Sequence, residues 1–221
     1  MDFYARLGFS QAVVGETWRH PYAVLTDGRV CVGLHQTELA DAATLTFVKP
    51  GLLKNLRGFE DLGVEFEFRR LGGDVFNEVG WRDPADNAVR VVEARTFSPL
   101  KRAAADRSLC GYFLEIALPA GDIETSKAFW ERFGFIGMDE ADSRVPHVCC
   151  MSDTIDLGLY DRRAVRRPSL LFECEDVDGA IAKIAAAGIE PVDVSRLELG
   201  VAGTAVFAAP EGTPILISTN T

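Results

Sequence analysis

The sequence predicts an α+β protein built from two tandem copies of one module, and two observations support this fold class. The segment FYARLGF at residues 3–9 recurs as FWERFGF at residues 129–135. Residues downstream then match at a nearly constant offset, so that segments 32–35 and 44–47 correspond to 157–160 and 169–172. An offset this steady indicates two copies of a unit of roughly 100 residues, which is longer than a solenoid repeat and close to a small domain.

Each copy contains an amphipathic helix that ends at a glycine. In the second copy the apolar residues of 122–133 recur at three- and four-residue spacing, which lays an apolar stripe along one helix face. Gly134 follows this stripe, and a residue without a Cβ can take the left-handed conformation that ends a helix. Gly8 follows the N-terminal helix in the same way, so we expect Gly8 and Gly134 to occupy equivalent positions.

Strand-like segments flank these helices in the same order in both copies. In the first copy we expect strands at 11–18, 21–27 and 29–36, a strand at 44–48, a helix at 50–63, and strands at 64–70, 76–82 and 88–93. In the second copy we expect a strand at 113–118, a helix at 122–133, three strands up to 160, a strand at 169–174, a helix at 177–188 and strands up to 218. The first copy has no counterpart of the strand at 113–118. Its open edge would invite pairing, so we expect the linker or a homodimer contact to cover it.

These elements divide the chain into module 1 at residues 1–99, a polar linker at 100–109 and module 2 at 110–221. The 221 residues are 48% hydrophobic, which is enough to bury a core as one or two domains. The net charge of −10 disfavours nucleic-acid binding. No segment is apolar enough to span a membrane and no secretory signal opens the chain, so the expected location is cytoplasmic.

The side chains that carry reactive or charged groups outside this pattern have simple explanations. The odd number of cysteines and the lack of CxxC spacing indicate free, mostly buried thiols. A cluster of arginines falls in an expected loop and is interpreted as a solvated face; its members are Arg162, Arg163, Arg166 and Arg167.

The order and duplication of the motifs resemble the vicinal oxygen chelate superfamily, which includes glyoxalase I, the bleomycin-resistance proteins and the extradiol dioxygenases. The resemblance covers nearly the whole chain and rests on FYARLGF, FWERFGF, VGLHQ, SLLFECEDVDGAIAKIAAAGIE, DPADN and APEGT. It implies tandem βαβββ modules whose curled mixed sheets surround a cup-shaped cavity. It does not fix the reaction, because the superfamily contains metal-dependent lyases, isomerases and dioxygenases as well as metal-free binding proteins.

Strand parity predicts which side chains point into this cup, because alternate residues of a strand face opposite sides of the sheet. Branched residues mark the side that packs on the helices, and the intervening residues should face the cup. In the second copy, Leu114, Ile116 and Leu118 should face the helices. The residues expected to bind a ligand in the cup are Glu115, Arg90, His35, Tyr160, His147 and Tyr22, and Trp18 and Trp81 are further candidates for its walls.

The resemblance also implies where a metal would bind, since the superfamily's metal enzymes take His, Gln or Glu ligands from three strand positions. Those positions carry Glu115, Ser169 and Leu216 in the second copy, and Thr44 and Arg90 in the first, where the first-strand position is missing. Hydroxyl, guanidinium and isobutyl groups do not replace imidazole or carboxylate around a divalent ion. The sequence-based expectation is therefore no metal and no other cofactor; a divalent ion, if present, would lie near Glu115 and His35.

Two function classes follow, and the sequence leaves both open. The first is a protein of the bleomycin-resistance kind that binds a small organic molecule without a metal, with Glu115 and Arg90 as polar anchors. The second is a metal-dependent lyase, isomerase or dioxygenase in which Glu115 acts as base or ligand, assisted by His35 or His147. A purely structural interaction module is a third alternative. For Glu115 itself, the competing structural explanation is a buried salt bridge to Arg90.

Overall fold

The fold was analysed in a computed structural model that describes residues 1–14, 20–36, 43–73, 77–93, 108–140, 145–192 and 205–219. The first half contains helices α1 (Asp2–Arg6) and α2 (Leu52–Asp61) and strands β1 (Ser10–Gln11), β2 (Tyr22–Thr26), β3 (Cys31–His35), β4 (Leu45–Lys49), β5 (Phe68–Arg70), β6 (Glu78–Arg82) and β7 (Ala88–Glu93). The second half contains helices α3 (Ile123–Arg132) and α4 (Val177–Ala186) and strands β8 (Tyr112–Ala120), β9 (Ile136–Glu140), β10 (His147–Met151), β11 (Leu157–Asp161), β12 (Ser169–Glu173), β13 (Ala205–Ala208) and β14 (Pro214–Ser218).

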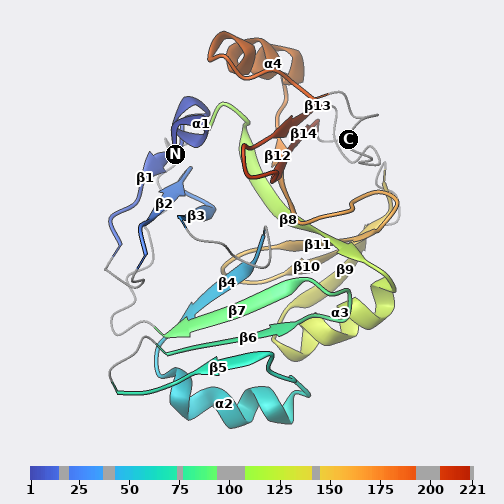
Figure 1. The fold of residues 1–221 in the computed structure, drawn as a ribbon. Helices are drawn as coiled ribbons and strands as arrows, with labels where there is room; N and C mark the ends of the chain where they lie inside the picture. The colour runs from blue at the N-terminus through green and yellow to red at the C-terminus, as the bar shows by residue number, and fades with distance from the viewer. Residues whose placement is uncertain are drawn as a thin grey trace.

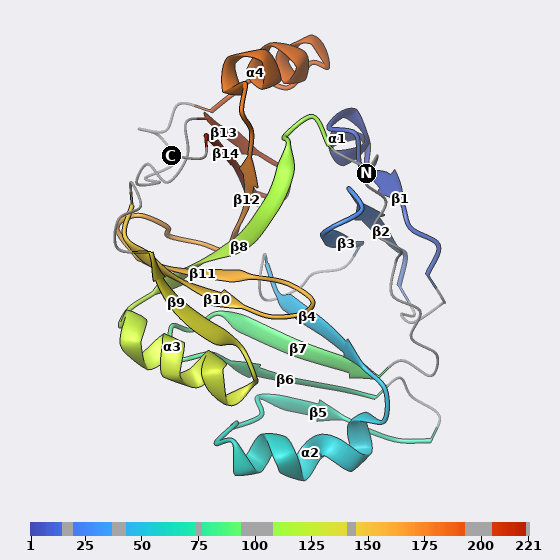
Figure 2. The same ribbon diagram turned by 180° about the vertical axis from the view of Figure 1, so that it is seen from behind.

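The strands of the described residues form three sheets, which are curled but not closed (Figures 1 and 2). The second half forms one seven-stranded sheet in the order β13-β14-β12-β8-β11-β10-β9. Its centre is the antiparallel pair β8 and β12, which joins two half-sheets edge to edge. The first half forms two separate sheets, β1-β2-β3 and β4-β7-β6-β5. The α+β fold class with tandem modules is therefore confirmed.

The same unit of strand, helix and further strands recurs along the chain. Strands β4, β8 and β12 each precede a helix and pair in parallel with a later strand of the same unit, namely β7, β11 and β14. Helix α1 has no such strand before it. Gly8 and Gly134 both follow a helix with positive φ, 93° and 88°, as the repeat predicts. Gly33 and Gly158 likewise lie in equivalent strands, β3 and β11.

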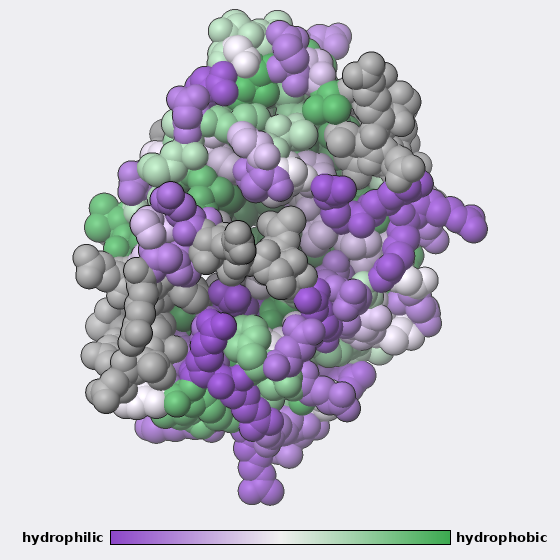
Figure 3. All heavy atoms as spheres, in the orientation of Figure 1, coloured by the Kyte–Doolittle hydropathy of each residue, from purple (hydrophilic) through white to green (hydrophobic). Residues whose placement is uncertain are grey.

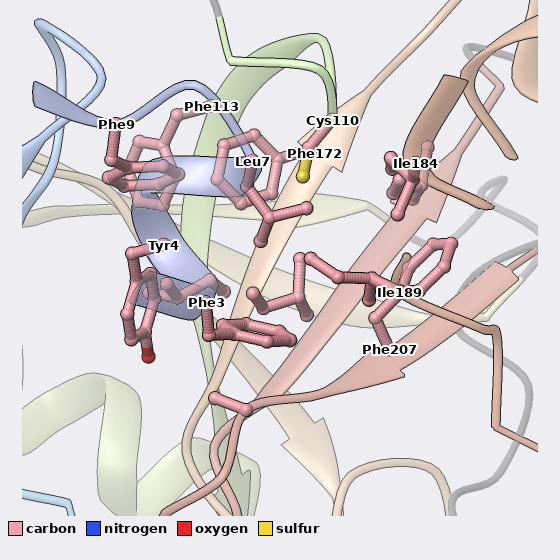
Figure 4. Packing of buried hydrophobic residues seen from close by; sticks show 14 of the residues in the cluster. Phe3, Tyr4, Leu7, Phe9, Cys110, Phe113, Phe172, Ile184, Ile189 and Phe207 are labelled. Carbon is pink, nitrogen blue, oxygen red and sulfur yellow. The ribbon is translucent and has the colours of Figure 1, made fainter. Parts of the chain in front are cut away.

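Two hydrophobic clusters hold the two halves together. The first contains α1 residues together with residues of β12, β13, β14 and α4, and Figure 4 shows Phe3 and Leu7 gathered with Phe172 and Phe207. The second joins α2 and the β4–β7 sheet to α3, where the rings of Trp81 and Phe133 stack at 5.9 Å. Helices α1 and α4 accordingly lie at one end of the molecule and α2 and α3 at the other (Figures 1 and 2).

Some predicted details were wrong. Leu114 is 41% exposed, because β8 and β12 shift register between Leu171 and Phe172 and this bulge breaks the alternation. Trp81 lies in the core and not on a cavity wall, since it is 2% exposed. Of the predicted strand at 11–18, only Gln11 lies in a strand (β1), residues 12–14 do not, and residues 15–18 lie outside the described residues. The predicted strand at 64–70 begins only at Phe68, in β5. Trp18 and most of the predicted linker at 100–109 lie outside the described residues.

The exposure of the cysteines and the hydropathy of the surface were also compared with the sequence-based expectations. All the cysteines are free, but Cys31 is exposed and only Cys110 and Cys150 are buried, so the expectation of buried thiols holds in part. No helix among the described residues is long and apolar enough to cross a membrane. On the face seen in Figure 3, hydrophilic residues predominate and hydrophobic ones form small separate areas.

Candidate active site

Glu115 is a buried carboxyl in the middle of the seven-stranded sheet. It lies on β8, opposite Leu171 of β12, and is 1% exposed. Its neighbours Ile116 and Leu118 face the helix-packed clusters, so Glu115 and Ala117 face the opposite side of the sheet. A carboxyl in this position is costly unless polar partners satisfy it, so its contacts decide what the site can do.

Two aromatic side chains from neighbouring strands meet Glu115. The Tyr160 hydroxyl on β11 donates a hydrogen bond of 2.6 Å to Oε1 of Glu115. His147 on β10 stacks on the Tyr160 ring, with centroids 4.4 Å apart and planes 10° apart. The imidazole Nε2 of His147 lies 4.0 Å from the same Oε1. The strands bring these groups together because His147 and Tyr160 are direct partners in the β10–β11 register.

The position of the His147 ring indicates its tautomer. Its Nδ1 lies 3.0 Å from the backbone carbonyl oxygen of Val145. A carbonyl only accepts hydrogen bonds, so Nδ1 carries the proton in this contact. In the neutral imidazole, Nε2 therefore presents a lone pair towards Glu115.

Gly158 makes space for the carboxyl group on β11. A Cβ at this position would lie 2.0 Å from Oε1 of Glu115 and 2.5 Å from Cε2 of Tyr160. Any side chain there would displace both groups, so the glycine of the VGLH/LGLY repeat is required for this cluster. The repeat revealed the glycine, but its contact with a side chain of another strand depends on the register between strands.

Burial dominates the protonation behaviour of the cluster. It raises the pKa of Glu115, against the opposing effects of the Tyr160 hydrogen bond and the nearby His147. Burial and the neighbouring Glu115 together raise the pKa of Tyr160, and they raise the pKa of the Cys149 thiol to about 12. Tyr160 and Cys149 are thus protonated donors at neutral pH, while Glu115 can act as a proton acceptor of raised basicity.

The other predicted ligand-binding residues form a separate cluster in the first half. Tyr22 stacks on His35, with centroids 5.8 Å apart, and Nδ1 of His35 lies 2.9 Å from Nε2 of His20. Burial lowers the pKa of His35, and the charges of His20 and Arg90 lower it further. An Nη1 atom of Arg90 lies 3.7 Å from Oε2 of Glu78.

This arrangement corrects one prediction about a shared site. Arg90 pairs with Glu78, with 3.7 Å between Nη1 and Oε2, while Glu115 contacts Tyr160 and His147. The placement of a divalent ion near both Glu115 and His35 stays a prediction. The sequence interpretation missed His20 and Glu78, although parity along β6 does put Glu78 on the same face as Gly80, opposite the core-facing Val79 and Trp81.

The residues at the family's metal-ligand positions do not fit a three-ligand site. Oε1 of Glu115 is engaged by Tyr160, the Ser169 hydroxyl donates to the carbonyl of Arg167 at 2.8 Å, and Leu216 is a buried hydrocarbon. Among the described residues there is also no group of three or more His, Cys, Asp or Glu side chains that could hold a metal ion. We therefore derive no chemical step through a metal.

Comparison with known proteins identifies the fold of the chain. No family model matches the chain, and no curated protein sequence matches it. A catechol 2,3-dioxygenase structure matches 98% of this chain and 81% of its own, with a TM-score of 0.58 at 15% identity. Homoprotocatechuate 2,3-dioxygenase from Arthrobacter globiformis matches 99% of this chain and 74% of its own, with a TM-score of 0.58 at 16% identity. The chain spans 66% of a homoprotocatechuate 2,3-dioxygenase from Brevibacterium fuscum, with a TM-score of 0.59 at 15% identity. The chain therefore has the vicinal oxygen chelate fold, as its motifs predicted.

These neighbours also correct the expectation that the protein uses no cofactor. Their names identify them as dioxygenases, which belong to the metal-dependent members of the superfamily and not to its metal-free binding proteins. The expectation of no cofactor depended only on the loss of ligand residues from the chain. The fold comparison points the other way, so that expectation is withdrawn.

Proposed function

We propose that this chain is a small-molecule enzyme of the vicinal oxygen chelate superfamily, whose active site is the Glu115 cluster in the seven-stranded sheet. The reaction classes are those of the superfamily's lyases, isomerases and dioxygenases. The observation that carries the proposal is the fully buried Glu115, hydrogen-bonded by Tyr160 and facing Nε2 of His147.

In this proposal Glu115 is the general base. Burial makes its carboxylate more basic than an exposed one, which suits proton abstraction from a hydroxyl group or an acidic C–H bond. Tyr160 orients the carboxylate through its hydroxyl group. Nε2 of His147 lies 4.0 Å from Oε1 of Glu115, so one bridging water or a small rotation of a side chain lets it take the proton from Glu115. His147, whose side chain is 13% exposed, then releases the proton to solvent, which returns both groups to their starting state.

The surroundings of the cluster favour a flat substrate. The His147–Tyr160 stack provides an aromatic surface, and Leu171 and Leu216 are buried apolar neighbours on adjoining strands. The side chain of His147 is 13% exposed whereas that of Glu115 is 1% exposed. A substrate therefore reaches the carboxyl group from the side of His147. A phenolic or enolisable ring compound satisfies these conditions because it combines an aromatic face with a removable proton.

A panel of catechols, phenols and cyclic 2-oxo compounds tests the proposal, with binding measured by thermal shift and conversion by mass spectrometry. Metal content is measured in the same untreated sample, because a stoichiometric divalent ion would align the chemistry with that of the dioxygenase neighbours. For any compound converted, Glu115→Gln should lower the rate by about 10²-fold or more. The matched control is Glu124→Gln, the same change on an exposed residue of α3. Equal activity of Glu115→Gln and wild type would overturn the role of Glu115.

A further inference from the structure

A cavity lies at the junction of the two halves, and none of its lining residues belongs to the Glu115 cluster. Its volume is about 400 Å³, which is within the range of small-molecule sites. It lies between the β6–β7 turn, the segment before β12 and the β13–β14 turn. The polar residues that line it are Arg82, Asp86, Asn87, Arg166, Arg167 and Thr213.

The charge of this cavity is opposite to that of the protein. Three of its lining residues are arginines and one is an aspartate, in a chain of net charge −10. Glu67 and Asp86 lie 3.0 and 3.9 Å from Nε of Arg82 and partly balance its charge, so the excess positive charge of the cavity comes from Arg166 and Arg167. The guanidinium group is the side chain best suited to bind phosphate and carboxylate groups, because its planar fork of donors matches their oxygen atoms.

The wall formed by the β6–β7 turn is rigidly held. The buried carboxylate of Asp83 accepts hydrogen bonds from the backbone N–H groups of Ala85 and Asn87 and from the side-chain amide of Asn87. Asp86 in this turn has a φ of 70°, the one positive value of a non-glycine residue in the described part of the chain. Aspartate tolerates this conformation better than most residues, but it remains uncommon and indicates a closely specified turn.

The same turn is tied to the second half of the chain. The Asn87 amide donates to the carbonyl of Pro119 at 3.1 Å, and the Arg162 guanidinium donates to the carbonyl of Ala85. On the opposite wall, Nη1 of Arg167 donates to the carbonyl of Gly212 at 3.4 Å. That long contact uses one of the five N–H donors of Arg167. The wall formed by the β6–β7 turn is therefore positioned before any ligand arrives, which lowers the entropy lost on binding, while the exposed Arg167 is held by one long contact.

We infer that this cavity binds a small organic anion carrying two negative charges, either a phosphate monoester or a dicarboxylate. The arginines of the loop before β12, interpreted from the sequence as a solvated face, supply its charge. A bound anion contacts the walls from both halves, so it also stabilises their junction by binding only the folded chain. The inference is independent of the chemistry proposed for Glu115.

Titration calorimetry tests the site with inorganic phosphate and succinate as the doubly charged probes and acetate as the singly charged control, at fixed ionic strength. Phosphate or succinate should bind more tightly than acetate, and the tighter of the two identifies the ligand class. Arg167→Gln should weaken that binding roughly tenfold, because it removes a charged hydrogen-bond donor. Arg163→Gln is the matched control, since Arg163 is exposed in the same loop and does not line the cavity.

A second variant, which should strengthen anion binding where Arg167→Gln weakens it, makes the test more stringent. Asp86→Asn removes the carboxylate of the cavity while keeping a residue that tolerates positive φ, so it should strengthen anion binding. The inference is overturned if wild type binds the doubly charged probes no better than acetate. It is also overturned if Arg163→Gln weakens binding as much as Arg167→Gln, because the effect would then come from general surface charge.

Discussion

Replacing Glu115 with Gln should change how the stability of the protein depends on pH. Burial raises the pKa of Glu115 in the folded state above the value of about 4.3 expected in the unfolded chain. Well below that unfolded value the carboxyl is protonated in both states, so its contribution to folding is complete. As the pH rises, the unfolded chain loses its proton first, and the free energy of unfolding falls until the pH passes the folded pKa.

The size of the effect follows from this linkage. Each unit by which folding raises the pKa removes about 1.4 kcal/mol of wild-type stability at high pH. The amide introduced by Glu115→Gln stays neutral and can still accept the Tyr160 hydrogen bond, while its N–H group can donate towards His147. At acid pH the variant should therefore match wild type within about 1 kcal/mol. At neutral and higher pH it should be the more stable protein, by about 1.4 kcal/mol for each unit of pKa shift.

Urea unfolding at a series of pH values measures this difference. Glu124→Gln is the control, because that side chain is exposed on α3 and its difference from wild type should stay flat with pH. A flat difference for Glu115→Gln as well would show that Glu115 is not in the desolvated environment described above. A variant that is several kcal/mol less stable at neutral pH would point instead to a buried salt bridge.

Three further predictions concern the core, the site and the sheet edge. Phe129→Ala should lower the free energy of unfolding by about 3–5 kcal/mol, because Phe129 is 7% exposed and packs in the second cluster; an unchanged urea midpoint would mean that the wrong helix face was assigned. Gly158→Ala should destabilise by about 1–3 kcal/mol and displace Glu115, since its Cβ would overlap Oε1. At the matched Gly33 the nearest side-chain atom would lie 3.4 Å away, so Gly33→Ala should change stability by about 0.5 kcal/mol or less; equal effects would contradict the contact. Among the described strands, β3 and β4 each lie at the edge of a sheet, and the sequence predicts that the linker or a second copy covers such an edge. If a second copy covers it, sedimentation velocity should detect a dimer; a monomer whose edges are also uncovered by the linker would contradict the prediction.

The sequence predicted those features that depend on local periodicity. The repeat located the helices and the glycines that end them, and strand parity put Glu115, His147 and Tyr160 on one face before any register was known. These succeed because the alternation of a strand and the stripe of a helix are properties of short segments. For this reason the sequence correctly predicted that the three site residues of the second half share one face of the sheet.

The features that failed depend on which strands become neighbours. Arg90 was expected to pair with Glu115, yet it pairs with Glu78 of the neighbouring strand β6. Parity shows which way a side chain points, but it does not show which charged group lies beside it. Leu114 was misassigned because the bulge arises from the register between β8 and β12, and a bulge leaves no mark in the alternation of one strand.

The arginines of the loop at residues 162–167 are exposed, as the sequence predicted, but their position relative to the rest of the chain was not predicted. A run of arginines between two strands has the composition of any solvated loop. Its position opposite Arg82 appears only when the β6–β7 turn docks on the second half of the chain. Long-range docking of this kind is the part of the structure that sequence periodicity cannot supply.

The central claim, that the Glu115 cluster is where the substrate binds, is tested most directly by NMR of the histidine rings. The chain has three histidines, of which His147 belongs to the Glu115 cluster and His20 and His35 lie together in the first half. A phenolic or enolisable compound that binds the protein should shift the ring resonances of His147 and leave those of His20 and His35 unchanged, and the shift should be lost in Glu115→Gln. Shifts confined to His20 and His35, or an undiminished His147 shift in Glu115→Gln, would contradict the claim.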